Sequence, residues 1–320
     1  PLSYYTGVSG TPLNASPESE EAYRLAFSAT IFHWGINAWS VYAIIGLSLA
    51  FFCYNWRLPL TIRSIFYPLL GNRIWGWQGD IIDIIAVLAT LFGLTTSLGL
   101  GARQAASGLF YLFDVPNNLL TQSLIIIFIT SVVIFSVYRG LNKGVKVLSN
   151  INIGLALVLL AFVVLAGPTF KIIMAYGENL ISYFQDIVRL SNWNRPDDLQ
   201  WYHDWTIFYW AWWLALGPQV VLFVTRVSKG RSLRQLNTGM IFFGSLGCFL
   251  FYMILGNYAI NLELSGQLAV SELLVNEGHR ITATKVLLTL PFGSVFLFAY
   301  CLMVVIFIAT SYDSVSYVIA

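Results

Sequence analysis

Tryptophans and tyrosines gather in two stretches of this sequence where the surrounding residues are apolar. The first stretch holds Trp34, Trp39 and Tyr42, and the second is the run 205–213, which ends in Trp213. Trp39 and Tyr42 are three residues apart and would share one face of a helix. A quaternary ammonium ion has no N–H group to donate, but ring faces attract its methyl-covered positive charge. These residue types therefore suit a cage for such an ion.

The same rings have a second interpretation. Tryptophan and tyrosine form belts at membrane–water interfaces, and both stretches begin near the outer end of an apolar run. The residues alone therefore leave a binding cage and an interfacial belt open.

A polar cluster interrupts the last apolar run, with Thr310, Ser311, Tyr312, Asp313 and Ser314 in succession. Polar groups inside a membrane span are costly and mark either a pathway or a structural pair. Hydroxyl oxygens suit a small hard cation such as sodium, because hard cations prefer oxygen ligands. The alternative is that the hydroxyls donate back to carbonyls of their own helix.

Hydroxyl side chains also recur at Thr90, Thr95, Thr96 and Ser97, just before the glycine-rich stretch 99–101. Small residues let helices approach closely, and they also permit a helix to unwind and present its carbonyls to an ion. Close packing is the interpretation we favour for this stretch, although the long run that contains it has room to bend here.

Two ionisable residues lie within or beside apolar runs. Asp83 is at the start of the run that contains the threonines, and we expect it to pair with an arginine of the preceding loop. His33 adjoins Trp34. A lone histidine at such a position is more often a satisfied packing residue than a proton relay.

Composition places these side chains in a membrane. Of the 320 residues, 58% are hydrophobic and 10% are charged, and the mean hydropathy is +0.72. A soluble domain carries about 25% charged residues, so lipid is the natural solvent for this chain. The net charge of +2 does not indicate nucleic-acid binding. No nucleophile–base pair, phosphate loop or metal spacing indicates an enzyme, and the cysteines Cys53, Cys248 and Cys301 are far apart in the sequence.

The apolar runs are long enough to cross a bilayer, which takes about 20 residues of helix. The segment 177–190 differs from them, because its apolar residues recur at helical spacing while Asn179 and Asp186 face elsewhere. We interpret it as an amphipathic helix in the interface, and a loop helix packed on the spans is the alternative. We predict an all-α integral membrane protein with seven spans, near residues 31–54, 81–112, 119–138, 149–167, 205–225, 236–259 and 293–318.

Charge is distributed unevenly between the loops. The loops on one side are basic, and those on the other side are rich in acidic residues. The positive-inside rule places the basic loops in the cytoplasm and the N-terminal segment outside, as in a multi-pass protein of the cell (inner) membrane. The basic residues of the inner side are Arg57, Arg63, Arg73, Arg139, Lys143, Lys146, Arg226, Lys229, Arg231 and Arg234.

Several motifs occur together in this chain. They read Phe-His-Trp at 32–34, Tyr-Pro-Leu-Leu-Gly at 67–71, Thr-Ser-Leu-Gly-Leu-Gly at 96–101, Trp-Thr-Ile-Phe-Tyr-Trp-Ala-Trp-Trp at 205–213, and Arg-Val-Ser-Lys-Gly-Arg at 226–231. With Thr310 and Ser311, this combination resembles the betaine/carnitine/choline transporter family over essentially the whole chain.

The resemblance implies a fold of the LeuT type, which is built from two inverted five-helix repeats, and places this chain at about spans four to ten of twelve. It implies a secondary transporter for quaternary-ammonium solutes of the glycine betaine, choline or carnitine class, used in osmoprotection. Sodium-coupled symport by alternating access, with Na+ as coupling ion and no other cofactor, and a homotrimer in the bilayer are further implications.

The chain begins with Pro1 and ends inside an apolar run at Ala320. We therefore expect residues 1–320 to be one transmembrane transporter domain truncated at both ends, with the helix 177–190 on the periplasmic side. Sodium-independent exchangers of the family carry an arginine at or beside the position of Asn152, so this chain is expected to be sodium-coupled. A sodium-independent exchanger and a betaine-binding osmosensor that does not transport are the alternatives.

Carried over residue by residue, the resemblance assigns the substrate cage to Trp34, Trp39, Tyr42 and Trp213. Leu216 departs from the family, which has a further tryptophan near the substrate path, and this puts the identity of the substrate in doubt.

The resemblance also assigns sodium ligands. The hydroxyls of Thr310 and Ser311 would bind sodium together with carbonyls of the family's third span, which we expect to be absent from this chain, and Thr90 matches one ligand of a second sodium site. Leu94 stands where the sodium-coupled carriers can have a threonine, and Gln219 where they have a phenylalanine. These departures put the second sodium site in doubt.

Overall fold

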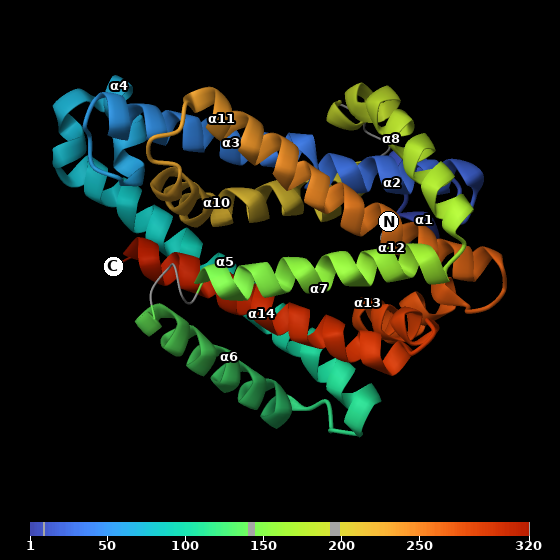
Figure 1. Cartoon of the computed structure of the whole chain (residues 1–320). Helices are drawn as coiled ribbons and strands as arrows, with labels where there is room; N and C mark the ends of the chain where they lie inside the picture. Colours follow the sequence, from blue (N-terminus) through green and yellow to red (C-terminus); the bar gives the residue numbers. More distant parts are fainter. Residues whose placement is uncertain (9, 140–144, 193–198, 320) are drawn as a thin grey trace.

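The computed structural model describes residues 1–8, 10–139, 145–192 and 199–319, and these residues form an all-α protein (Figure 1). Within them, seven helical segments are long and apolar enough to cross a membrane, which confirms the predicted spans. The segments are Glu20–Asn55, Trp77–Phe113, Leu119–Ser136, Lys146–Ala166, Leu199–Val227, Leu233–Leu264 and Gly293–Tyr312.

The described residues form fourteen α-helices and several short 3-10 and π-helical segments. The π-helical segments are Phe51–Asn55, Tyr202–Ile207 and Gly239–Phe243, and each directly continues into or out of a long α-helix. The α-helices are α1 (Leu2–Thr6), α2 (Glu20–Trp34), α3 (Ile36–Ala50), α4 (Tyr67–Leu70), α5 (Trp77–Phe113), α6 (Leu119–Arg139), α7 (Val145–Ala166), α8 (Thr169–Ser191), α9 (Leu199–Trp201), α10 (Phe208–Val227), α11 (Leu233–Thr238), α12 (Gly244–Leu264), α13 (Val270–Leu288) and α14 (Gly293–Ile319).

The first span is interrupted between α2 and α3 at Gly35. Its backbone has φ −99° and ψ −137°, which is not helical. A Cβ atom at this position would lie 2.4 Å from the ring of Phe249 and 2.6 Å from the carbonyl oxygen of Ile31, so only glycine fits. The break separates Trp34, the last residue of α2, from the aromatic residues of α3.

The second span is one continuous helix, α5, and does not bend or unwind at residues 99–101. Its glycines bring it close to α14 instead, because a Cβ atom at Gly101 would lie 2.0 Å from Ile308 and one at Gly108 would lie 2.0 Å from Cys301. This contact confirms the packing interpretation for Gly101, whereas a Cβ atom at Gly99 would meet nothing within 4 Å and Thr95 and Thr96 are exposed.

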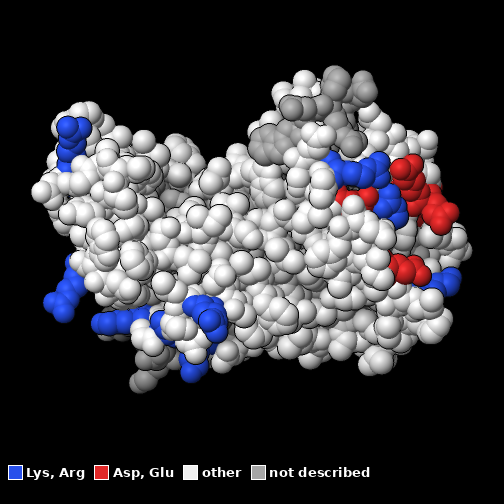
Figure 2. Space-filling view, turned by 90° about the horizontal axis from the view of Figure 1, so that it is seen from above, with Lys and Arg blue, Asp and Glu red and all other residues white. Residues whose placement is uncertain are grey.

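The long helices run roughly along one axis, with α4 and α11 at one end of the bundle and α8 and α13 at the opposite end (Figure 1). On the face shown in Figure 2, the end with α4 and α11 carries basic side chains only, whereas acidic and basic side chains lie together at the opposite end. Of the basic residues predicted for the inner side, Lys143 and the side chain of Arg139 lie outside the described residues.

The predicted amphipathic segment 177–190 is part of the longer helix α8, which packs against α2 and α12. Asp186 is buried against α2, where its carboxylate pairs with Arg24 and accepts a hydrogen bond from Ser28 at 3.1 Å. Asn179 is also buried and donates to Asn257 of α12 at 3.3 Å. The polar face of α8 therefore contacts the bundle.

Candidate binding site

Of the four aromatic residues assigned to the cage, Trp213 contacts each of the other three. The ring of Trp213 lies 5.7 Å from Trp34, 5.6 Å from Trp39 and 4.8 Å from Tyr42, measured between centroids. Trp39 and Tyr42 are 5.8 Å apart and nearly perpendicular. Tyr42 and Trp213 are buried, at 3% and 7% exposure, so these rings face the interior of the bundle as a cage would require.

The interruption at Gly35 helps to position Trp213. A helix that ends leaves the carbonyls of its last turn without partners inside the helix. The indole N–H of Trp213, on α10, donates to the backbone carbonyl of His33 in the last turn of α2, at 3.0 Å. This hydrogen bond fixes the indole of Trp213 relative to the break and brings α10 against the junction of α2 and α3.

His33 is a packing residue, as predicted. Its side chain is fully buried, with Nδ1 3.0 Å from the hydroxyl of Tyr4 and Nε2 2.9 Å from the hydroxyl of Thr206. A neutral imidazole donates from one nitrogen and accepts at the other, and both hydroxyls can take the complementary role. The histidine is therefore satisfied within the protein.

Two rings that the sequence analysis did not assign to the cage extend its aromatic surface. Tyr209 lies 5.2 Å from Trp34, and Tyr252 lies 5.4 Å from Trp34. A cavity of about 90 Å³ is lined by these three residues together with Pro1, Ser3, Tyr4, Thr30 and Trp205. Tyr209 belongs to the aromatic run 205–213, so a signal for it existed. Tyr252 lies on α12 in an ordinary apolar stretch, and nothing in the sequence pattern distinguishes it.

The hydroxyls of Thr310 and Ser311 both donate to the backbone carbonyl of Phe307, at 3.0 and 2.9 Å. This is the back-bonding arrangement considered as the alternative to an ion site. It does not remove their capacity to bind a cation, because a hydroxyl that donates its hydrogen keeps its oxygen lone pairs. The side chains of Asp313 and Ser314 lie outside the described residues.

Thr90 is buried on α5, away from the cage residues, and borders a second cavity of about 210 Å³. The neighbouring α14 reaches the same helix where the hydroxyl of Tyr312 donates to the carbonyl of Leu94 at 3.2 Å. Gln219 on α10 is also buried, and its side-chain oxygen has no hydrogen-bond partner among the described residues. The lining of the cavity consists of Leu60, Thr61, Ile62, Asp83, Ala86, Val87, Thr90, Pro218 and Leu222.

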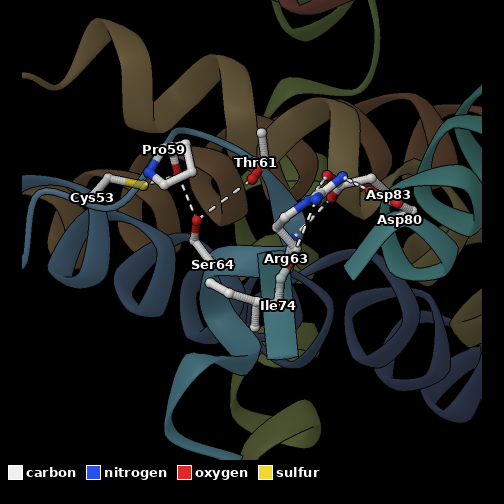
Figure 3. A network of polar contacts seen from close by, with 8 residues as sticks. All are labelled: Cys53, Pro59, Thr61, Arg63, Ser64, Ile74, Asp80 and Asp83. Atoms are coloured by element: carbon white, nitrogen blue, oxygen red, sulfur yellow. Dashed lines mark hydrogen bonds and ion pairs between the residues drawn. The ribbon is translucent and has the colours of Figure 1, made fainter. Parts of the chain in front are cut away.

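Arg63, in the loop between α3 and α5, is the centre of a network of polar contacts at one side of this cavity (Figure 3). Arg63 forms an ion pair with Asp83, a second with Asp80 at 2.9 Å, and a hydrogen bond to the carbonyl of Ile74 at 3.3 Å. The backbone N–H of Arg63 also donates to Asp83, at 3.0 Å. The predicted pairing of Asp83 is therefore confirmed. The hydrogen bond that the Arg63 side chain donates to Asp83 is the main cause of the raised pKa of Arg63, so the guanidinium stays charged.

Within the part of the chain that the structure describes, no three His, Cys, Asp or Glu side chains are grouped as a transition-metal site would need. The residues that the geometry brings together are aromatic rings and hydroxyls. Such a set can hold an organic cation by its ring faces and a small hard cation by its oxygens.

Known transporters of one family are similar to this chain. The model of the betaine/carnitine/choline family transporters matches residues 1–320. Glycine betaine transporter 1 of Vibrio parahaemolyticus is 43% identical over 100% of this chain and 61% of its own length. Glycine betaine transporter OpuD of Bacillus subtilis is 38% identical over 100% of this chain and 62% of its own length. The High-affinity choline transport protein of Escherichia coli K12 is 37% identical over 82% of this chain and 39% of its own length. The chain thus spans less than two thirds of these relatives.

Proposed function

The chain belongs to the betaine/carnitine/choline family of transporters, and from this premise we propose that the full protein carries a quaternary-ammonium solute across the membrane. Glycine betaine and choline are the substrates we infer, since similar proteins are named for them. The observation that carries the proposal is the contact of Trp34, Trp39 and Tyr42 with Trp213, at 4.8 to 5.7 Å where each meets that ring.

The ammonium group binds among these four rings. Its charge cannot be met by a hydrogen bond, and a carboxylate partner would hold it too tightly in an apolar interior. Ring faces attract it without a full countercharge and tolerate its methyl surface. Alternating access then exposes this midplane site to one side of the membrane at a time.

Sodium is the coupling ion in our proposal, bound by the hydroxyl oxygens of Thr310 and Ser311. Thr90 is a candidate ligand of a second sodium ion. Each sodium that enters with the membrane potential contributes about 2.3 kcal/mol per 100 mV. Coupling requires that sodium and substrate raise each other's affinity by the same factor. A Ser311→Ala variant should therefore lower sodium affinity and, at low sodium, the apparent substrate affinity as well.

The proposed orientation places the basic loops in the cytoplasm, by the positive-inside rule. The end with α8, where acidic and basic side chains lie together, is then on the periplasmic side of the inner membrane. A homotrimer is the assembly we propose, with the exposed apolar face of α8 as part of the contact. Ile181, Phe184 and Val188 form that face, at 60%, 57% and 76% exposure.

The test is uptake of labelled glycine betaine by the full-length protein in proteoliposomes, with and without an inward sodium gradient. We expect uptake that depends on the sodium gradient and that unlabelled choline inhibits. Uptake that requires substrate inside the vesicles but no sodium would make the protein an exchanger and remove the role of Thr310 and Ser311. Binding without any uptake would make it an osmosensor.

A further inference from the structure

The helix α12 supplies none of the four cage rings, yet it packs along α3, which carries two of them. Glycines allow this contact at three levels. A Cβ atom at Gly35 would lie 2.4 Å from Phe249 of α12, and one at Gly46 would lie 3.3 Å from the sulfur of Met240 in the π-helical segment that leads into α12. Between these two contacts, Gly244 faces the indole of Trp39. A helix without cage residues therefore forms the wall against which one cage ring rests.

The contact between Gly244 and Trp39 is the tightest of these for a cage residue. A Cβ atom at Gly244 would lie 2.3 Å from Cδ2, 2.4 Å from Cε2 and 2.6 Å from Cε3 of the Trp39 indole. These three atoms surround the bond shared by the two indole rings, so the glycine lies against the face of the ring. Ordinary van der Waals contact begins at 3.4 Å. A single methyl group at Gly244 would therefore displace the indole by about 1 Å.

Such a displacement reaches the cage directly. Trp39 contacts Trp213 at 5.6 Å and Tyr42 at 5.8 Å on its other sides. An indole displaced from α12 changes its contacts with these two rings. We therefore expect a trimethylammonium group, which would need the full separation of these rings, to lose more affinity than a smaller ammonium group.

We propose that Gly244 is a positioning residue that holds Trp39 at the depth required for a trimethylated ammonium group, and so sets the size selectivity of the cage. This inference rests on the proposed function, because it concerns the same cage. Gly244 lies outside the aromatic motifs, on a helix that contains none of them.

The experiment compares Gly244→Ala with Gly247→Ala in the full-length protein. Gly247 is on the same helix, three residues further along, and a Cβ atom there would meet nothing within 4 Å. Dissociation constants are measured by calorimetry for glycine betaine and for dimethylglycine, which has one methyl group fewer. Gly244→Ala should weaken glycine betaine binding about ten-fold and dimethylglycine binding at most about three-fold. Gly247→Ala should leave both constants within two-fold.

A second variant separates positioning from a general loss of folding. Trp39→Phe has a smaller ring, which leaves space for the added methyl group. If Gly244 acts through Trp39, the double variant Trp39→Phe/Gly244→Ala should bind glycine betaine as well as Trp39→Phe alone. An equal loss for both ligands in Gly244→Ala, or the same further loss in the Trp39→Phe background, would overturn the proposal. Wild-type protein that binds neither ligand would overturn the proposed function itself, and the selectivity role with it.

Discussion

Two helices of this protein differ in the side chains through which they contact the bundle. The membrane-spanning α10 directs Trp213 into the bundle, where it contacts other rings. The helix α8 directs Asn179 and Asp186 into the bundle and leaves an apolar face outside, with Phe184 and Val188 exposed at 57% and 76%. Both helices also expose apolar side chains, since Leu214 of α10 is 57% exposed, but only α8 buries an aspartate.

The difference follows from the solvent. In water, an apolar stripe predicts the buried face of a helix. Apolar residues that contact lipid or a second subunit do not have to be buried within the bundle. Specific contacts between helices then determine which face of a helix packs inward. For α8 these are the ion pair of Asp186 with Arg24 and the hydrogen bond from Asn179 to Asn257. The two helices should therefore respond differently to substitution.

The largest effect is expected for Asp186→Ala, which breaks the contact of α8 with α2. The change leaves Arg24 without its carboxylate and Ser28 without its acceptor. Breaking a buried ion pair costs about 3–5 kcal/mol, and because the Arg24 side chain is 33% exposed we expect about 2–3 kcal/mol here. Thermal unfolding of the purified full-length protein measures it. Glu178→Ala, at an exposed position of the same helix, is the control and should change stability by less than about 0.5 kcal/mol.

The next effect concerns α10 and should appear in binding. Trp213→Ala removes the ring that contacts the other three cage residues, and substrate affinity should fall by roughly 1–2 kcal/mol, or about five- to thirty-fold. Trp212→Ala is the matched control, since Trp212 is the preceding residue but contacts Phe208 at 5.5 Å. Calorimetric titration with glycine betaine distinguishes them. If neither variant lost affinity, the aromatic run would act as an interfacial belt and not as a cage.

A smaller effect tests whether α8 and the cage are independent. The hydroxyl of Tyr183 on α8 donates to Asn37 on α3, two residues before Trp39, at 2.5 Å. Tyr183→Phe keeps the buried ring and removes this bond, which should lower stability by about 1 kcal/mol. Substrate affinity should stay within two-fold. An affinity loss as large as that of Trp213→Ala would show that α8 controls the cage, and the contrast between the two helices would fail.

The smallest effect on the isolated subunit is expected for Phe184→Gln on the outward face of α8. The ring is exposed, so folding and substrate affinity should be unchanged within about 0.5 kcal/mol. Self-association of the full-length protein, measured by its mass in detergent, should decrease if this face contacts a second subunit. An unchanged trimer would mean that another surface holds the subunits together.

The sequence predicted those features that depend on residue type and spacing. Long apolar runs gave the seven spans, and the charge of Asp83 beside an arginine-rich loop gave its ion pair with Arg63. The aromatic motifs identified four rings that the fold brings into contact. The interruption at Gly35 was not predicted. Phe249 of α12 approaches Gly35 so closely that no side chain fits there, and these two residues are distant in the sequence.

The sequence pattern also did not predict which face of α8 packs against the bundle. The apolar spacing of 177–190 predicted a helix, but the face that packs is selected by Arg24 on α2 and Asn257 on α12. Tyr252 and Gly244 meet the cage for the same kind of reason, since both lie on α12, whose sequence carries no aromatic motif. Contacts between distant segments decided each of these features.

The central claim is that the rings recognise positive charge, and a carbon isostere tests it most directly. In 3,3-dimethylbutanoate, a carbon atom replaces the nitrogen of glycine betaine, so that shape and carboxylate are kept while the positive charge is lost. Competition against labelled glycine betaine is measured on the full-length protein in proteoliposomes. Our account predicts that unlabelled glycine betaine displaces the label and that the isostere is at least ten-fold weaker. Equal competition by both compounds would show that the cage recognises shape alone and would contradict the account.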